Sequence, residues 1–201
     1  MPAWNFISRL ATLIFGLFIY GIGVAMLVHA EIGIPPWDVL AQGLGLRLGI
    51  SFGQATVVVS LLVMLLWIPL RVKVGLGSVL NAILIGLFAD LVLPWLPELE
   101  HYWQQMLVFL LALLIVSFAT GLYISVGMGK GPRDGLMIGL ASKLKRPFWQ
   151  IRTAVEAVVV TAGFLLGGQV REGTLIFVLT IGYLNQLALR LFGLADKSGR
   201  V

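Results

Sequence analysis

Two acidic motifs with the same arrangement of residues carry the clearest chemical signal in this sequence. Asp38 and Asp134 each follow a proline by two positions, in the segments Gly-Ile-Pro-Pro-Trp-Asp (33–38) and Gly-Lys-Gly-Pro-Arg-Asp (129–134). Proline costs no hydrogen bond at a first helical position, and an aspartate in the first turn faces the positive end of the helix dipole. The two carboxylates therefore either stabilise helix starts or, in a polar interior, bind a cation, an amine or a proton.

The residues around these aspartates predict a break in the chain before each of two short helices. We expect Gly33 and Pro36 to form the first break, and Gly131 and Pro132 to form the second. Glycine lets the chain leave a preceding helix, and proline restarts one because its missing N–H is not needed there. Arg133 makes the second motif more basic than the first, and we include it among the predicted substrate-binding residues.

Three further polar residues complete the predicted substrate-binding set. Asp90 falls inside an apolar run, where a charge at mid-bilayer costs about 2.5–3.5 kcal/mol, so we expect it to line a polar interior. Gln54 and Gln150 each follow an aromatic residue near the start of an apolar run. Helix capping is the alternative role for these two glutamines.

Arg152 and Glu156 form a second charged group within an apolar run. Their spacing of four residues predicts an ion pair on one face of a helix. Because both lie within about two turns of the predicted cytoplasmic end of the helix, we expect them at the membrane surface, with their charged ends in the headgroups.

The sequence predicts no catalytic residues, no cofactor and no metal site. It contains no cysteine, and its two histidines, His29 and His101, have no second ligand at metal-binding spacing. The phosphate-binding loop, zinc-protease and nucleophilic-serine motifs are also missing from it. We therefore expect a protein that is not an enzyme.

The composition is that of a membrane protein. Hydrophobic residues make up 59% of the chain, charged residues only 11%, and the mean hydropathy is +1.01. A soluble domain carries about 25% charged residues, so lipid must cover most of this surface. The net charge of +5 comes from basic residues in short loops, as membrane topology requires, and predicts no nucleic-acid partner. We expect residues 1–201 to form a single transmembrane domain.

Six apolar runs are long enough to cross the bilayer, which needs about 20 helical residues. They lie at residues 8–29, 52–71, 76–97, 104–126, 148–168 and 173–193. Two shorter segments, 36–49 and 132–146, follow the first and fourth runs. A helix of about 14 residues reaches only about 21 Å, so these segments are predicted to be re-entrant or to lie flat at the interface.

The chain contains an internal repeat at an offset of 96 residues. Comparison of residues 33–86 with 129–182 gives 16 identities in 54 positions without a gap. We place repeat 1 at about 8–97 and repeat 2 at about 104–193. Each repeat has three predicted crossings, an odd number, so the second repeat must be inverted relative to the first. The fold class is therefore an all-α membrane protein of about six transmembrane helices in two inverted repeats.

The loop charges predict the orientation of the chain. Basic residues gather in the loops on one side of the predicted topology: Arg9, Arg71, Lys73, Lys130, Arg133, Lys143, Lys145, Arg146, Arg190, Lys197 and Arg200. The opposite side receives mainly acidic residues, including Glu31, Glu98 and Glu100. By the positive-inside rule, both termini are cytoplasmic.

Several motifs together resemble a known family. They are Gly-Ile-Gly-Val-Ala (21–25), Gly-Ile-Pro-Pro-Trp-Asp-Val-Leu (33–40), Gly-Ile-Ser-Phe-Gly-Gln (49–54), Gly-Leu-Gly-Ser-Val-Leu-Asn (75–81) and Gly-Pro-Arg-Asp-Gly-Leu-Met (131–137). Over nearly the whole chain they resemble the YczE branch of the YczE/YyaS/YitT bacterial membrane proteins. This resemblance implies a multi-span protein of the bacterial inner membrane, and it supplies neither a substrate nor catalytic residues.

These features favour a small secondary transporter for a small solute, with a cation or an amine preferred. Inverted-repeat transporters place broken helices at corresponding positions of both halves, next to a central site. The alternative is a membrane partner without transport activity, such as a substrate-capturing subunit or an accessory to a biosynthetic enzyme. The expected contacts are the lipid bilayer, a small-molecule substrate, and a membrane partner or further copies of the chain.

Overall fold

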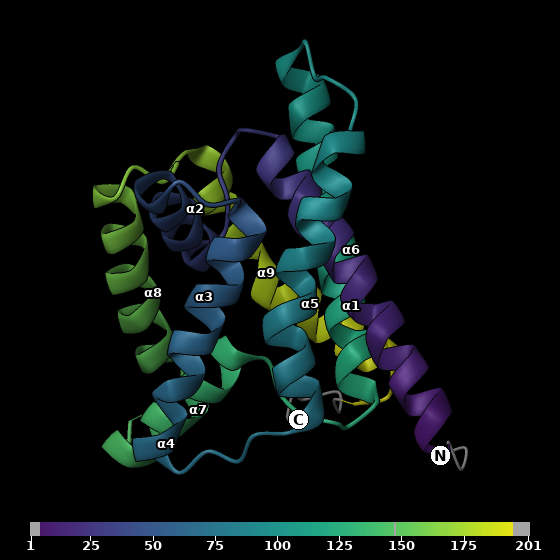
Figure 1. The fold of residues 1–201 in the computed structure, drawn as a ribbon, viewed down its shortest axis with the longest axis vertical. Helices are drawn as coiled ribbons and strands as arrows, with labels where there is room; N and C mark the ends of the chain where they lie inside the picture. Colours follow the sequence, from purple (N-terminus) through teal and green to yellow (C-terminus); the bar gives the residue numbers. More distant parts are fainter. Residues whose placement is uncertain (1–4, 147, 195–201) are drawn as a thin grey trace.

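The computed structural model describes residues 5–146 and 148–194, which are helical with short connections and contain no strand (Figure 1). The helices are α1 (Phe6–His29), α2 (Pro36–Leu48), α3 (Phe52–Leu65), α4 (Trp67–Leu70), α5 (Leu76–Val92), α6 (Tyr102–Ser125), α7 (Pro132–Leu144), α8 (Phe148–Leu165) and α9 (Glu172–Leu191), with a 3₁₀ turn, η1 (Leu93–Trp95), after α5.

Five helical segments in the described part of the chain are long and apolar enough to cross a membrane. They are Phe6–His29, Phe52–Leu70, Leu76–Trp95, Tyr102–Ser125 and Glu172–Leu191. The expected sixth span corresponds to α8, which has 18 residues and is not among the five. The predicted count of six is therefore not confirmed.

The two short helices begin and end where the sequence predicts. Both start at the proline of their motif, and both have aspartate in the first turn. The chain reaches them through Gly33 (φ +124°) and Gly129 (φ +144°), backbone angles that side-chain-bearing residues rarely adopt. Gly49 (φ +66°) ends α2 in the left-handed conformation, and Lys145 (φ +51°) ends α7 in the same way.

Helix starts recur at a separation of 96 residues. The pairs are α1 and α6, α2 and α7, α3 and α8, and α5 and α9. The backbone residues with positive φ recur at the same separation, as Glu31 and Gly127, and as Arg71 and Gly167, illustrate. The duplicated sequence therefore has matching helix boundaries in its two halves.

The helices form two groups that meet along α3 and α5. In one group α1 packs against α5 and α6, and α6 packs against α9. In the other group α2 packs mainly on α8, and α7 packs on α3, α4 and α8. The short helix of each half thus packs on the third helix of the opposite half. Figure 1 shows α2 near one end of the molecule and α7 near the other.

The extended segments before the short helices are held by hydrogen bonds from the opposite half. The Gly173 amide, at the start of α9, donates to the Ile32 carbonyl oxygen over 2.7 Å. The Gly77 amide, at the start of α5, donates to the Met128 carbonyl oxygen over 2.8 Å. These bonds satisfy backbone groups that the helix breaks expose, and they fix the depth at which α2 and α7 begin.

Candidate functional site

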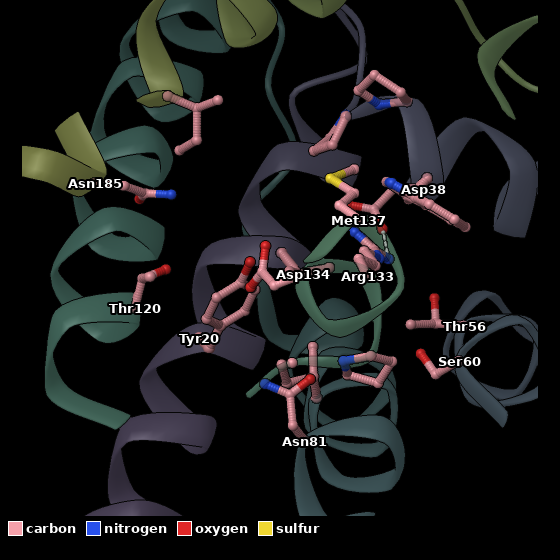
Figure 2. Close-up of a pocket in the computed structure, with 18 of the residues that line it drawn as sticks. Tyr20, Asp38, Thr56, Ser60, Asn81, Thr120, Arg133, Asp134, Met137 and Asn185 are labelled. Carbon is pink, nitrogen blue, oxygen red and sulfur yellow. Dashed lines mark hydrogen bonds and ion pairs between the residues drawn. The ribbon is translucent and has the colours of Figure 1, made fainter. Parts of the chain in front are cut away.

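A polar cavity of about 100 Å³ lies where the two groups of helices meet. Every helix except α4 contributes to its lining, and the starts of both short helices point into it (Figure 2). A cavity needs roughly 10–15 Å³ to hold one water molecule, so this one accommodates several waters or a small solute.

Most of the lining comes from equivalent positions of the two halves. Nine pairs separated by 96 residues account for 18 of the 22 lining residues. The pairs are Val24/Thr120, Pro35/Gly131, Pro36/Pro132, Trp37/Arg133, Asp38/Asp134, Thr56/Arg152, Ser60/Glu156, Asn81/Phe177 and Ile85/Ile181, and the other four residues are Tyr20, Tyr123, Met137 and Asn185. The cavity therefore lies at the centre of the duplicated arrangement, and the structure brings Asp38, Arg133 and Asp134 together there.

Asp38 and Arg133 form a buried ion pair between the two short helices. The guanidinium Nη2 of Arg133 donates to Asp38 Oδ1 over 2.5 Å, and the Arg133 and Asp38 side chains are 26% and 3% exposed respectively. The guanidinium also lies 5.9 Å from the centre of the Trp37 ring, within the range of a cation–π interaction. The pair neutralises both charges and joins the start of α2 to the start of α7.

Asp134 is the carboxylate of the cavity that lies outside both ion pairs, although the charges of Arg152, Arg133 and Lys130 act on it. No hydrogen bond or ion pair to its side chain is present within residues 5–146 and 148–194. Three oxygen atoms surround the Cα of Gly131: a Cβ built there would lie 3.2 Å from the Tyr123 hydroxyl, 3.4 Å from Asp134 Oδ2 and 3.6 Å from Asn81 Oδ1. Figure 2 shows the Tyr20 side chain beside Asp134 as well. This oxygen-rich, aromatic surrounding suits a cation.

Arg152 and Glu156 form the predicted pair on α8, and both residues line the cavity. Arg152 Nε donates to Glu156 Oε1 over 3.0 Å. Their side chains are 32% and 14% exposed. The pair reaches the cavity because α8 turns this face towards α2 and α7, which the hydropathy of one helix does not reveal.

Three buried polar atoms of the lining have no hydrogen-bond partner among the described residues. They are Trp37 Nε1, Thr56 Oγ1 and Asn185 Oδ1. Leaving a buried donor or acceptor unpaired costs about 1–3 kcal/mol, which a bound ligand or water would recover. One donor and two groups able to accept thus remain available in the cavity.

The formal charges of the lining sum to minus one. Asp38, Asp134 and Glu156 contribute three negative charges, and Arg133 and Arg152 contribute two positive charges. The two ion pairs account for four of these five charges, so the excess is that of Asp134. A monovalent cation would balance it, whereas an anion would add to it.

The structure places the other predicted residues outside the cavity lining. The Asp90 carboxylate accepts hydrogen bonds from Ser51 Oγ and, over 2.8 Å, from the Gly53 amide, so it joins the end of α5 to the start of α3. Gln54 forms a capping box with Ser51, the alternative that the sequence left open for this glutamine. Gln150, in the first turn of α8, does not line the cavity either.

Four further polar residues of the lining were not among the predicted site residues. Tyr20, Asn81, Thr120 and Tyr123 are isolated polar groups in apolar runs, and they converge only through packing between the halves. In the described ranges, 5–146 and 148–194, no group of three or more acidic or histidine side chains could hold a metal ion.

Comparisons with known proteins place the chain in a family. Residues 7–190 match the model of a family of unknown function, DUF6198. A Haemophilus influenzae protein, described as uncharacterized, is 36% identical over 184 residues, covering 92% of this chain and 84% of the relative. The Bacillus subtilis uncharacterized membrane protein YczE is 30% identical over 176 residues, covering 87% and 82% respectively.

A second Bacillus subtilis protein, the uncharacterized YyaS, is 25% identical over 173 residues, covering 84% of this chain and 86% of the relative. No solved structure matches the chain significantly. The apolar helices and the similarity to YczE agree on an integral membrane protein. The chain belongs to the DUF6198 family, and the predicted resemblance to YczE and YyaS is confirmed.

Proposed function

We propose that this protein is a small secondary transporter that moves an organic cation or amine through the central cavity. The observation that carries the proposal is the unpaired carboxylate of Asp134, in a cavity lined by equivalent positions of both halves. A site on the pseudo-two-fold axis of a duplicated membrane protein can be reached from either side when the halves exchange conformations. Asp134 would bind the cationic group, and the Asp38–Arg133 pair would hold the two short helices around it.

The arrangement of the helices supports an inverted repeat. Each half runs through a long helix, a short helix and two further helices, and the two short helices lie towards opposite ends of the molecule (Figure 1). We take α8 as the sixth crossing, because 18 residues extend about 27 Å, close to the hydrocarbon thickness. With the loop charges, this topology supports a cytoplasmic location of both termini in a bacterial cell.

A difference between the halves supports alternating access. The α3–α5 contact is tight: a Cβ built at Gly53 would overlap the Gly86 carbonyl oxygen, and Asp90 bonds to the start of α3. No comparable packing joins α8 to α9 in the described part of the chain. At Gly182, the equivalent of Gly86, a built Cβ would meet no described heavy atom within 4 Å.

The two helix pairs therefore correspond to two gates in different states. In the predicted orientation, α3 and α5 close the extracellular side, and α8 and α9 are apart on the cytoplasmic side. Transport would require α8 to approach α9 while α3 leaves α5. Asp90 is then a residue that stabilises the closed extracellular gate and does not contact the solute.

Uptake into proteoliposomes tests the transport function directly. We expect radiolabelled tetramethylammonium, choline or putrescine to accumulate above the level of protein-free liposomes, and Asp134→Asn to abolish this uptake. Glu98→Gln is the matched control, because Glu98 is an exposed carboxylate outside the cavity. Absence of saturable uptake of all three cations, or equal uptake by Asp134→Asn, would refute the proposal and favour the accessory role.

Cross-linking in this cysteine-free chain tests the gates. One cysteine pair, Gln54→Cys with Leu87→Cys, lies one residue beyond the Gly53–Gly86 contact, and its equivalent is Gln150→Cys with Tyr183→Cys. A short bis-maleimide should join the first pair readily and stop uptake. The second pair should react faster when a saturating cation gradient drives turnover. A cross-linked first pair with full uptake would contradict a moving α3–α5 gate.

A further inference from the structure

An apolar groove adjoins the polar cavity. It lies between α2, α3, α7 and α8, has a volume of about 760 Å³, and is lined by aliphatic side chains, among them Leu40, Val59, Val63, Leu140, Val155 and Val159. Trp37 is the lining residue with a polar side-chain atom. On the outer side the groove is bordered by exposed leucines and valines of α3 and α8, so it faces the hydrocarbon of the bilayer.

The groove and the cavity share one wall. Trp37 lines both spaces. In four further places two consecutive residues line the groove and the cavity respectively: Val59 and Ser60 on α3, Leu136 and Met137 on α7, and Ile151 and Arg152 as well as Val155 and Glu156 on α8. Consecutive residues on a helix point about 100° apart, so a single layer of side chains separates the polar space from the apolar one.

Trp37 is placed to connect the two spaces. Its side chain is buried, its Nε1 has no hydrogen-bond partner among the described residues, and its ring contacts the guanidinium of Arg133. It is therefore held by packing and a cation–π contact, without a hydrogen bond that would fix one orientation. Rotation of this ring would open the cavity to the groove.

We propose that the transported molecule is an amphipathic cation, with its charged group at Asp134 and an alkyl chain of several carbons in the groove. The inference rests on the proposed function and adds the substrate class. The excess charge of minus one selects a cation over an anion or a zwitterion. The continuity of an acidic cavity with a fully apolar groove selects a molecule that has both a charged and an apolar part.

The same geometry implies a route of entry. The groove opens towards lipid between α3 and α8, and it adjoins the cavity through their shared wall. A cation with an alkyl chain already concentrates in the bilayer, because each buried CH₂ contributes about 0.8 kcal/mol, and it would reach the site sideways from the membrane. The small volume of the cavity would then need to hold only the charged group.

Competition binding on the protein in lipid nanodiscs tests the substrate class. Displacement of radiolabelled tetramethylammonium is measured with unlabelled tetramethylammonium and with decyltrimethylammonium below its micelle concentration. We expect decyltrimethylammonium to displace at concentrations at least about tenfold lower, which corresponds to the burial of only two methylene groups. Decyl sulfate, with the same chain and a negative charge, should not displace.

Groove variants separate binding in the groove from simple partition into the lipid. Val155→Trp and Leu140→Trp fill the groove from two different helices, and each should raise the concentration of decyltrimethylammonium needed by about tenfold while leaving tetramethylammonium unchanged. Val178→Trp on α9 is the control, since Val178 is exposed and outside the groove. Partition into the disc lipid is the same for every variant, so it cancels in the comparison.

The outcomes distinguish this inference from the proposed function. If both groove variants leave decyltrimethylammonium displacement unchanged, the alkyl chain is not in the groove and the inference fails, while cation transport still stands. If decanol displaces as well as decyltrimethylammonium, the groove holds any lipid chain and the inference also fails. If tetramethylammonium itself shows no saturable binding that Asp134→Asn removes, both proposals fail.

Discussion

Removal of one member of the Asp38–Arg133 ion pair should destabilise the fold strongly, because the other charge would remain buried. The two atoms are 2.5 Å apart, and the Asp38 side chain is 3% exposed. Breaking such a pair costs about 3–5 kcal/mol. Arg133 is 26% exposed and can recover some hydration, so we expect about 3 kcal/mol for Asp38→Ala, at the lower end of that range.

The double variant separates the pair from its surroundings. Arg133→Ala should also cost about 3 kcal/mol, since it strands the buried carboxylate. The double variant should cost at most about 3 kcal/mol instead of about 6, because neither charge is then left alone. The coupling free energy is thus at least about 3 kcal/mol. Asp38→Ala and the double variant both lose the interaction between Asp38 and the α2 dipole, which contributes about 0.3–1 kcal/mol. This loss therefore cancels in the coupling free energy.

A second ion pair in the same chain provides the control. Arg152 and Glu156 are four residues apart on α8, and Arg152 is 32% exposed. The coupling between residues at this spacing on one helix is about 0.3–0.5 kcal/mol. Both cycles would be measured by unfolding in mixed dodecylmaltoside–dodecylsulfate micelles, followed by circular dichroism. A coupling below about 1 kcal/mol for Asp38 and Arg133 would refute a buried pair between the short helices.

Three further predictions concern helix contacts. Gly86→Ala should lower the unfolding free energy of the protein by about 3 kcal/mol or more, because the added methyl group overpacks against α3. Its equivalent, Gly182→Ala, should raise the unfolding free energy by up to about 1 kcal/mol. Equal effects of the two variants on the measured unfolding free energy would contradict the difference between the halves. Asp90→Ala should cost about 2 kcal/mol and should increase the reactivity of an introduced Thr56→Cys with a membrane-impermeant thiol reagent applied from the extracellular side. Trp67→Phe removes the 3.0 Å hydrogen bond from Nε1 to the Pro132 carbonyl oxygen. It should lower the unfolding free energy by about 1–2 kcal/mol. An unchanged unfolding free energy would mean that this bond does not stabilise the start of α7.

The helix boundaries were predictable because they depend on local residue types and on the repeat. The short helix predicted at 36–49 spans Pro36–Leu48, and the one predicted at 132–146 spans Pro132–Leu144. Proline and aspartate determine the start of each, and the left-handed residue after each determines the end. Whether the short helices are re-entrant or lie flat at the interface depends on tertiary contacts, which the sequence does not reveal. The start of α2 is buried and Asp38 contacts Arg133, so α2 does not lie flat with its polar face in water.

The cavity lining was predicted only in part, because lipid-facing and interior positions of these helices are both apolar. Asp38, Asp134 and Arg133 were identified from a break motif, which marks a place on the chain whatever surrounds it. Asp90 was expected in the interior because it is charged, yet its partners, Ser51 and Gly53, lie 39 and 37 residues away in sequence. Such a partner satisfies a charge as well as a polar cavity does, and sequence spacing does not reveal it.

The two halves supply the same geometry but different chemistry to the site. Of the five charged residues in the lining, the first half contributes only Asp38. Where the second half has Arg133, Arg152 and Glu156, the first half has Trp37, Thr56 and Ser60. A site that had only the two shared aspartates, without Arg133, would place two unpaired carboxylates in one cavity, which burial does not tolerate.

Divergence at these few positions places one of the two duplicated aspartates in an ion pair and leaves the other outside one. Asp38 is neutralised by Arg133, a residue that exists in one half only, whereas its equivalent Asp134 lies beside Tyr20 (Figure 2). Exchange of the residues at positions 37 and 133 between the two halves therefore tests which aspartate binds the cation. In the variant that combines Trp37→Arg with Arg133→Trp, the arginine introduced on α2 should pair with Asp134 and leave Asp38 as the unpaired carboxylate. Cation uptake should then depend on Asp38 and no longer on Asp134, and uptake that still required Asp134 would contradict this account of the site.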